Sequence, residues 1–158
     1  MYLLAHTAVL IDRPRSVAFN YTANLENFAE WFPGVIRMAA ANELPFDAVG
    51  KQYRETVAVP LRGLRQVDLQ VIEVATPSRL VTQGTLKTVL PRMEIEFRDA
   101  GPDQCAVEWR MFSRTTGGVA RWTILPLTRR LMKSRAHAAM QRLKHRLEAA
   151  PRRTEERA

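Results

Sequence analysis

The residues with the clearest potential for chemistry lie two positions apart in one β-prone stretch. Tyr53, Glu55, Val57 and Val59 would share one face of a strand over 50–59. If that face points inward, the Glu55 carboxylate stands among apolar side chains and must either pair, for example with an arginine, or keep its proton to a higher pH. Both states suit proton transfer, with the Tyr53 hydroxyl orienting a carbonyl or phenol. A β-bulge or the opposite phase would instead turn Glu55 outward and Arg54 inward.

Other catalytic chemistries have little support. The three histidines, His6, His137 and His145, lack the spacing of metal ligands, and we expect His6 to face solvent. Cys105 has no histidine or acid beside it in the sequence and is interpreted as an inert thiol. The chain has no Gly-x-Ser-x-Gly turn, and residues 116–119 (TGGV) lack the lysine and spacing of a phosphate-binding loop. We therefore expect no metal and no cofactor.

The positive charge is concentrated in the last third of the chain. Residues 1–109 hold 11 Lys/Arg and 13 Asp/Glu, whereas residues 110–158 hold 13 and 3, which together give the net charge of +8. This region is either a solvated helix face with a basic tail or a surface for an acyl carrier protein or an anionic membrane. Nucleic acid is disfavoured because no aromatic residues are interleaved with the basic ones. The basic residues expected to make such contacts are Arg129, Arg130, Lys133, Arg142, Lys144 and Arg146.

The rest of the pattern describes the elements that must position these side chains. An apolar strand over 3–11 precedes two short helices, one after Pro14 and one that Asn24 caps and that runs through Trp31. Apolar and polar residues then alternate with the period of half-buried antiparallel strands, separated by Pro- and Gly-containing turns. The expected strands are 67–71, 93–97 and 107–111, with less regular ones at 35–43, 50–59 and 79–88.

A long helix follows Gly117-Gly118, well defined over 127–149, with Pro126 breaking or kinking its start. Met132, Ala136, Ala139, Leu143 and Leu147 form one apolar stripe of this helix. Because the middle of the stripe is alanine, the bulky strand residues opposite would leave space for a ligand or water. The alternative is that the sheet lies closer to the helix there.

The segment 11–35 (IDRPRSVAFNYTANLENFAEWFPGV) resembles the opening of the START-like, polyketide cyclase/dehydrase and lipid-transport superfamily. Residues 49–53 (VGKQY) and 71–81 (VIEVATPSRLV) are similar to later strands of that family, and the resemblance covers nearly the whole chain. It implies a helix-grip fold, in which the two short helices support the long helix and close one mouth of a cavity. Phe28, Trp31 and Phe32 would then line the cavity or only fill the core beneath these helices.

We therefore expect an α+β helix-grip domain over 1–150, with six to seven antiparallel strands wrapped around the C-terminal helix, and a disordered basic tail over 151–158. The favoured function is binding of a lipid, quinone or polyketide-like molecule in the cytoplasm. A cyclase, aromatase or dehydratase using Tyr53 and Glu55, and a protein that docks through its basic helix, are the alternatives. The expected ligand-binding residues are Phe28, Trp31, Phe32, Tyr53, Val57, Leu69, Ile95, Phe97, Trp109, Met111, Met132, Ala136 and Ala139.

Overall fold

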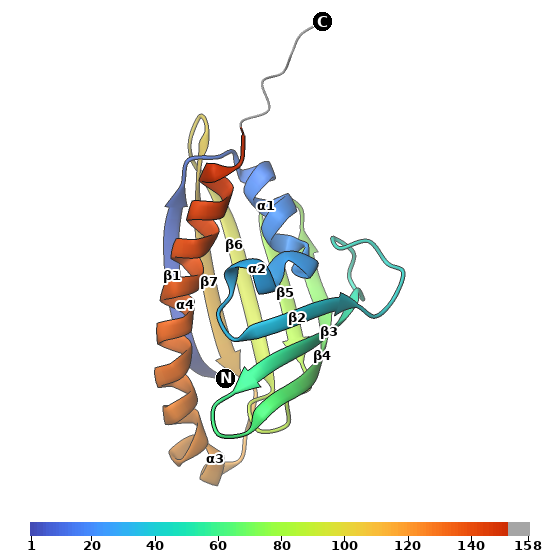
Figure 1. Cartoon of the computed structure of the whole chain (residues 1–158), viewed down its shortest axis with the longest axis vertical. Helices are drawn as coiled ribbons and strands as arrows, with labels where there is room; N and C mark the ends of the chain where they lie inside the picture. Colours follow the sequence, from blue (N-terminus) through green and yellow to red (C-terminus); the bar gives the residue numbers. More distant parts are fainter. Residues whose placement is uncertain (152–158) are drawn as a thin grey trace, which may run out of the picture.

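Seven antiparallel strands form one curved sheet in the computed structural model, which describes residues 1–151 (Figure 1). Their order across the sheet is β1-β7-β6-β5-β4-β3-β2, so β1 and β2 are the two edges. The long helix α4 (Ile124–Ala149) lies along the inner face of the sheet, as expected for the helix-grip fold. The strands are β1 Tyr2–Ile11, β2 Val35–Ala40, β3 Gln52–Val59, β4 Gly63–Ala75, β5 Arg79–Gly84, β6 Pro91–Gly101 and β7 Gln104–Ser113.

The alternation in β4, β6 and β7 gives the sheet an apolar inner face and a charged outer face. Buried inner residues such as Val71, Ile95 and Val107 belong to one hydrophobic cluster with the stripe of α4. This arrangement confirms the predicted strand phases in the three clearest strands.

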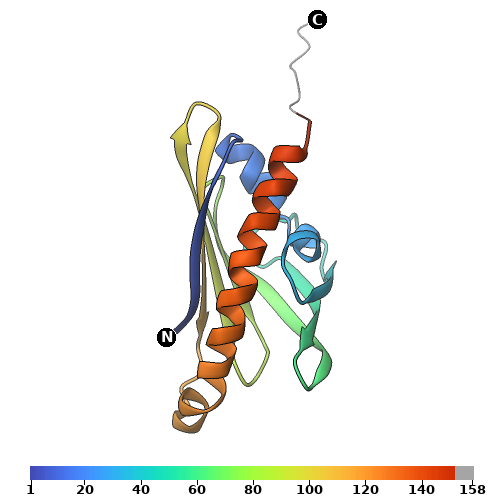
Figure 2. The same cartoon turned by 60° about the vertical axis from the view of Figure 1, so that its left-hand side comes forward.

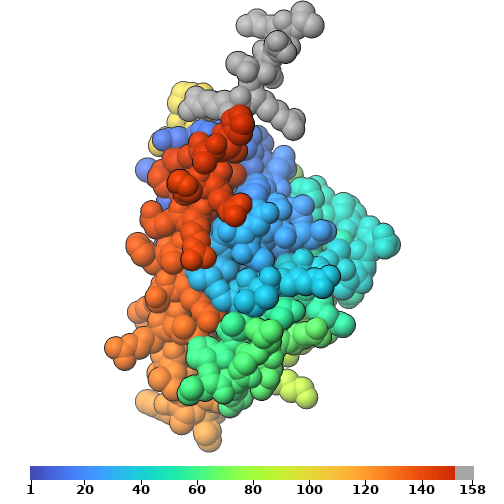
Figure 3. Space-filling view, in the orientation of Figure 1, coloured from blue at the N-terminus to red at the C-terminus, as the bar shows by residue number. Residues whose placement is uncertain are grey.

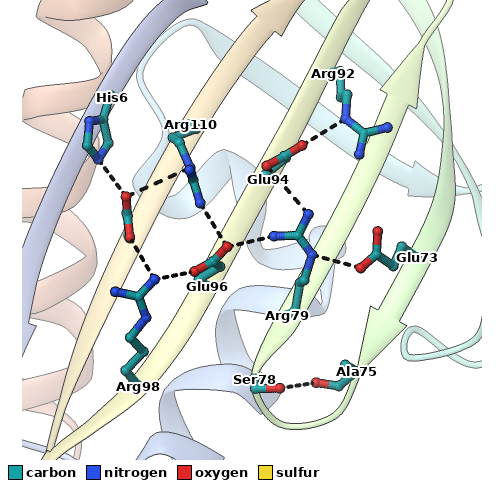
Figure 4. A network of polar contacts seen from close by, with 11 residues as sticks. His6, Glu73, Ala75, Ser78, Arg79, Arg92, Glu94, Glu96, Arg98 and Arg110 are labelled. Carbon is teal, nitrogen blue, oxygen red and sulfur yellow. Dashed lines mark hydrogen bonds and ion pairs between the residues drawn. The ribbon is translucent and has the colours of Figure 1, made fainter.

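A network of ion pairs crosses the outer face over five strands, β1, β7, β6, β5 and β4 (Figure 4). Its centre is Glu96, which Arg79 contacts at 2.7 Å, Arg110 at 2.8 Å and Arg98 at 2.6 Å. Partial burial acts to raise the pKa of Glu96, but these three guanidinium groups outweigh it and hold the pKa below its usual range. At one side of the network His6 Nε2 lies 2.7 Å from Glu108, which places His6 on the solvent face as predicted.

Three short helical segments follow β1: α1 (Arg15–Ala23), the 3₁₀ turn η1 (Leu25–Asn27) and α2 (Phe28–Trp31). The Asn24 side chain accepts a hydrogen bond from the Glu26 N–H at 3.3 Å, so it caps this segment as predicted, although the first turn is 3₁₀. Phe19 of α1 packs edge-on against Phe97 of β6, with ring centroids 5.3 Å apart.

The start of the long helix differs from the prediction. The break lies at Thr123, which separates the short helix α3 (Gly118–Trp122) from α4, and not at Pro126. Pro126 is the third residue of α4, where a backbone N–H has no acceptor within the helix, so proline is tolerated there. The predicted strand over 79–88 also ends earlier, at Gly84, and two backbone hydrogen bonds onto the Leu86 carbonyl fold residues 86–90 into turns.

Polar contacts hold the far end of α4 against the short helices. Arg146 donates to the backbone carbonyl of Glu30 in α2 at 3.0 Å, and the Tyr21 hydroxyl of α1 donates to the Glu30 carboxylate at 2.5 Å. Arg13 donates to the Glu148 and Ala150 carbonyls at the C-terminal end of α4, at 2.6 and 2.9 Å. These bonds satisfy carbonyls that the helix itself leaves without donors. Of the expected tail, residues 152–158 lie outside the described residues.

Candidate functional site

Glu55 lies on the inner face of β3. Its neighbours show the phase: Tyr53 is buried, and Arg54 points outward to pair with Asp68 at 3.1 Å. The β3–β4 pairing is regular from Gln52 to Val59, so no bulge reverses this phase. Of the two alternatives, Glu55 inward or Arg54 inward, the structure therefore shows Glu55 inward. Its partners on the neighbouring strands are Met38 and Val67.

Arg135 of α4 faces Glu55 and was not among the predicted site residues. Its guanidinium donates to the Ala58 carbonyl at 3.0 Å and lies flat against Gly34, where any Cβ would overlap it. Gly34 also has a φ of +89°, which disfavours other residues independently. Helical spacing could have identified Arg135 in the sequence. It lies three residues after Met132 and four before Ala139, so it is on the same side of the helix as the buried stripe.

The two charges are close enough to interact but do not form an ion pair. Among residues 1–151 no side-chain hydrogen bond and no salt bridge reaches the Glu55 carboxylate, which is half-buried. Burial raises the pKa of Glu55 from 4.5 to about 7, and Arg135 opposes this shift only in part. Burial also lowers the pKa of Arg135, and Glu55 opposes that change. Glu55 is thus a carboxyl group that gains and loses its proton near neutral pH.

Besides the Thr22 hydroxyl and the Nε–H groups of Arg110 and Arg114, three donors on buried aromatic side chains have no partner in the described part of the chain. They are the Tyr53 hydroxyl and the indole N–H groups of Trp31 and Trp109. Burial raises the pKa of Tyr53 to about 12, although the Leu25 backbone opposes this shift, so the hydroxyl stays protonated. The Leu25 backbone does not form a hydrogen bond of normal geometry with it. A buried donor left unpaired costs about 1–3 kcal/mol, so a ligand oxygen that reached one would gain that amount.

The predicted aromatic residues form one stack that reaches from α2 to β7. Phe28 and Phe32 stack with ring centroids 4.9 Å apart, and Phe32 lies 5.2 Å from Trp109. Trp31 meets Phe28 edge-on at 4.9 Å. All four rings are at most 4% exposed. The structure therefore brings together four of the expected ligand-binding residues.

This stack changes the expectation of a hollow beneath the alanines of α4. Ala136 and Ala139 are 1% and 0% exposed and belong to the same hydrophobic cluster as the four rings. Two shallow concavities among residues 1–151 lie on the outer side of α4, around Gln141 and His145. In the space-filling view, α4, α2 and β2 lie side by side and cover the inner face of the sheet (Figure 3). Aromatic rings from a distant segment thus belong to the same buried cluster as the alanines.

The other predicted ligand-binding residues divide into two groups. Val57 and Met111 are half-buried on the inner face, and Val57 shares the side of β3 with Glu55. The remainder are buried in the common cluster, and Phe97 packs under α1 rather than toward Glu55. These buried residues are Leu69, Ile95, Phe97, Met132, Ala136 and Ala139.

The basic residues predicted to bind a partner differ in whether they already contact other parts of the chain. Lys144 donates to the Leu10 carbonyl at 2.7 Å and pairs with Glu148 at 2.6 Å, and Arg146 holds α2 as described above. Arg129 lies over the Tyr2 ring, 6.0 Å from its centroid. Arg130, Lys133 and Arg142 are exposed.

Of the other candidates, Cys105 is buried, and burial raises the pKa of its thiol. Within residues 1–151 no group of three or more His, Cys, Asp or Glu side chains is arranged to hold a metal ion. None of the described helices is both long enough and apolar enough to cross a membrane.

A family model described as "Polyketide cyclase / dehydrase and lipid transport" matches residues 4–148. The chain belongs to this family. The polyketide cyclase/dehydrase and lipid transport family thus accounts for the helix-grip architecture, and it confirms the resemblance found in the sequence. Among curated proteins, none matches the chain by sequence.

Solved structures show the same fold. TTHA0849 from Thermus thermophilus matches with a TM-score of 0.72 and 12% identity, over 94% of this chain and 99% of that one. The Zhui aromatase/cyclase from Streptomyces sp. R1128 matches with a TM-score of 0.67 and 12% identity, over 91% and 92%. The di-domain ARO/CYC BexL from the BE-7585A biosynthetic pathway matches with a TM-score of 0.65 and 15% identity over 92% of this chain, which spans only 50% of that protein. At these identities the likeness establishes the fold of this family member.

Proposed function

We propose that the protein binds a small, largely apolar molecule that carries several oxygen atoms, between the inner face of β3 and α4, in the cytoplasm. The observation that carries the proposal is Glu55, a half-buried carboxyl group on the inner face with a pKa of about 7 and no hydrogen bond or ion pair among the described residues. A partly buried carboxyl group without a partner stabilises the fold less than an apolar side chain at the same position would. Groups of this kind are typical of functional sites.

The unpaired donors favour an oxygenated ligand over a simple hydrocarbon chain. Tyr53, Trp31 and Trp109 present one unpaired donor each within residues 1–151, and Arg135 adds further N–H groups near Glu55. These donors come from α2, α4, β3 and β7, so they match oxygens distributed along a molecule rather than one polar head. Quinones and polyketide-like compounds have this character. Since the Trp31 and Trp109 side chains are fully buried, a ligand oxygen reaches their N–H groups only if α2 or α4 moves outward.

The test is a binding comparison followed by amide chemical shifts of the ¹⁵N-labelled protein. A dihydroxyanthraquinone is compared with anthracene, which has the same ring system without oxygens, and with palmitate. We expect the quinone to bind most tightly and to shift the amides of β3, β7 and α2. Binding by none of the three compounds, or shifts confined to the outer side of α4, would refute the proposal.

Conservative variants locate the contacts. Trp109→Phe keeps a ring in the stack but removes the N–H, so it should weaken quinone binding about fivefold, as expected for one hydrogen bond, and leave anthracene binding unchanged. Trp122→Phe makes the same chemical change at an exposed tryptophan and is the matched control. Equal effects of the two substitutions would contradict a specific contact at Trp109.

A second candidate is acid–base catalysis of cyclisation or dehydration, favoured by the pKa of Glu55 near neutrality. In cyclisation, the Glu55 carboxylate would take a proton from a methylene between two carbonyl groups, the resulting carbanion would form a C–C bond with a distant ketone carbon of the same chain, and the Glu55 acid would return the proton to that ketone oxygen to give a hydroxyl. In dehydration, Glu55 would take the remaining proton from the same carbon and pass it to the hydroxyl, which leaves as water while a C=C bond forms. Tyr53, protonated at neutral pH, would donate a hydrogen bond to a carbonyl oxygen. Glu55→Gln should then bind a poly-β-carbonyl substrate normally and fail to convert it. Conversion by this variant at the wild-type rate would exclude the role.

A further inference from the structure

One end of the molecule exposes large apolar side chains on two separate segments. Val119, Trp122 and Leu127, in α3 and the first turn of α4, are 80%, 86% and 73% exposed. Leu61, at the tip of the β3–β4 hairpin, is fully exposed, and Leu64 is 58% exposed. Single exposed apolar residues are normal on a protein surface, but a group of them at one end marks an interaction surface.

The sheet topology brings both segments to the same end. Tyr2 of β1 and Pro91 of β6 both pair with Ser113, the last residue of β7, and α3 begins five residues later. The β3–β4 hairpin and the β5–β6 loop turn at this same end of the sheet. Both ribbon views show α3 and the hairpin at the end opposite to the C-terminus of α4, and Figure 2 shows them as two separate projections.

The conformation of Leu61 supports a role beyond folding. The turn Val59–Arg62, closed by an Arg62 N–H to Val59 carbonyl bond of 3.1 Å, places Leu61 directly after Pro60. Leu61 has a φ of +65° there, a value that glycine or asparagine adopts more easily. A leucine at this position is both strained and exposed to water, and neither property helps the isolated domain to fold.

The charged residues that flank these apolar residues in the sequence all have one sign. Residues 109–147 contain no Asp or Glu, and neither do residues 56–67. The basic residues that flank the exposed apolar ones in sequence are Arg62, Arg65, Arg121, Arg129, Arg130 and Lys133. A surface of this composition is complementary to a layer of negative charges that lies over apolar material.

We propose that this end of the molecule binds the surface of an anionic phospholipid bilayer. It consists of α3, the N-terminal part of α4 through Lys133, and the β3–β4 hairpin, and is hereafter called the docking end. Trp122, Val119, Leu127 and Leu61 insert at the level of the head groups, where tryptophan is enriched in membrane proteins, and the basic side chains contact lipid phosphates. A bilayer suits two separate apolar projections because it is fluid, whereas a folded protein partner would need two matching depressions. Contact without spanning agrees with the lack of an apolar helix long enough to cross a membrane in residues 1–151.

The experiment uses the full chain and vesicles of equimolar phosphatidylcholine and phosphatidylglycerol, with pure phosphatidylcholine vesicles for comparison. Sedimentation with vesicles measures binding, and tryptophan emission reports insertion. Trp31 and Trp109 are already buried, so a blue shift on adding anionic vesicles would come from Trp122. We expect binding to anionic vesicles with a blue shift that is lost in Trp122→Ala, and little binding to neutral vesicles. Absence of binding to anionic vesicles at low salt would overturn the proposal.

A matched pair of double variants tests the location. Arg130→Ala with Lys133→Ala removes two exposed charges from the docking end, and Arg37→Ala with Arg142→Ala removes two exposed charges elsewhere. Each basic side chain near an anionic surface contributes about fivefold to binding, so the first pair should lose about 25-fold and the second much less. Equal losses would show that overall charge acts rather than this surface, and would overturn the proposal.

An acidic protein is the competing partner for the same surface. If an acidic protein such as an acyl carrier protein bound the docking end while anionic vesicles did not, the membrane proposal would be wrong. Glu55 and Arg135 are not part of this surface. Failure here therefore leaves the proposed ligand binding unaffected, and failure of ligand binding does not remove the prediction for vesicles.

Discussion

Replacing Glu55 with glutamine should stabilise the protein at alkaline pH and leave its stability almost unchanged at acid pH. Burial raises the pKa of Glu55 in the folded protein from 4.5 to about 7. A carboxyl group whose pKa is raised by folding favours the folded state fully below about pH 4.5, and this contribution is lost as the pH rises through about 7. Glutamine resembles the protonated carboxyl group at every pH, so it keeps the favourable state.

The size of the effect follows from the change in proton affinity. A tenfold change in affinity is worth about 1.4 kcal/mol, so a pKa rise from 4.5 to about 7 corresponds to about 3 kcal/mol. Because the side chain is only half-buried, solvent screens part of this energy, and we expect about 2 kcal/mol at about pH 8.5.

The assay is urea unfolding of wild type and Glu55→Gln at about pH 4.5 and about pH 8.5, comparing the free energies of unfolding. Glu43→Gln, the same change at an exposed loop residue, is the control and should have no effect at either pH. If the difference between wild type and Glu55→Gln were the same at both pH values, Glu55 would not be titrating in the folded protein as inferred. The proposed role of its carboxyl group would then lose its basis.

Three further substitutions test the packing, each by chemical unfolding. Gly34→Ala should lower the free energy of unfolding by about 2 kcal/mol, because it strains a residue with positive φ and displaces Arg135. The control Gly117→Ala, where no atoms lie near the new methyl group, should have no effect. If Gly34→Ala also had no effect, the Arg135 guanidinium would not be held against Gly34. Trp109→Ala should cost about 3–5 kcal/mol as a core truncation, and a much smaller loss would indicate that the aromatic stack is loosely packed. Asn24→Ala should cost about 1 kcal/mol through the lost cap, and an unchanged midpoint would show that the 3.3 Å hydrogen bond contributes nothing.

The fold could be predicted largely because its signals are local. Alternation along β4, β6 and β7 predicted which side chains are buried, and the spacing of Met132, Ala136 and Ala139 predicted the buried stripe of α4. The same local patterns predicted the order of the elements, and the resemblance to a known family added the helix-grip packing, in which the short helices support the long one. The Asn24 cap is also a local signal, which is why it was predictable.

The features that could not be predicted depend on contacts between distant segments. The placement of Arg135 requires that its guanidinium reach Ala58 of β3 and Gly34, residues far earlier in the chain. Whether alanines leave a hollow depends on whether rings of α2 reach Trp109, and side-chain types alone do not determine that distance. The break at Thr123 rather than Pro126 follows from a proline being acceptable within a first turn, so its presence did not fix the boundary.

The outer-face ion network has a consequence for how the strands align during folding. Glu96 meets arginines from β5, from β7 and from its own strand only when all three strands are in register (Figure 4). A shift of one strand by a single residue would turn its charged side chains into the core and its apolar ones into water. The network therefore penalises misaligned pairings of these strands more than it strengthens the correct pairing.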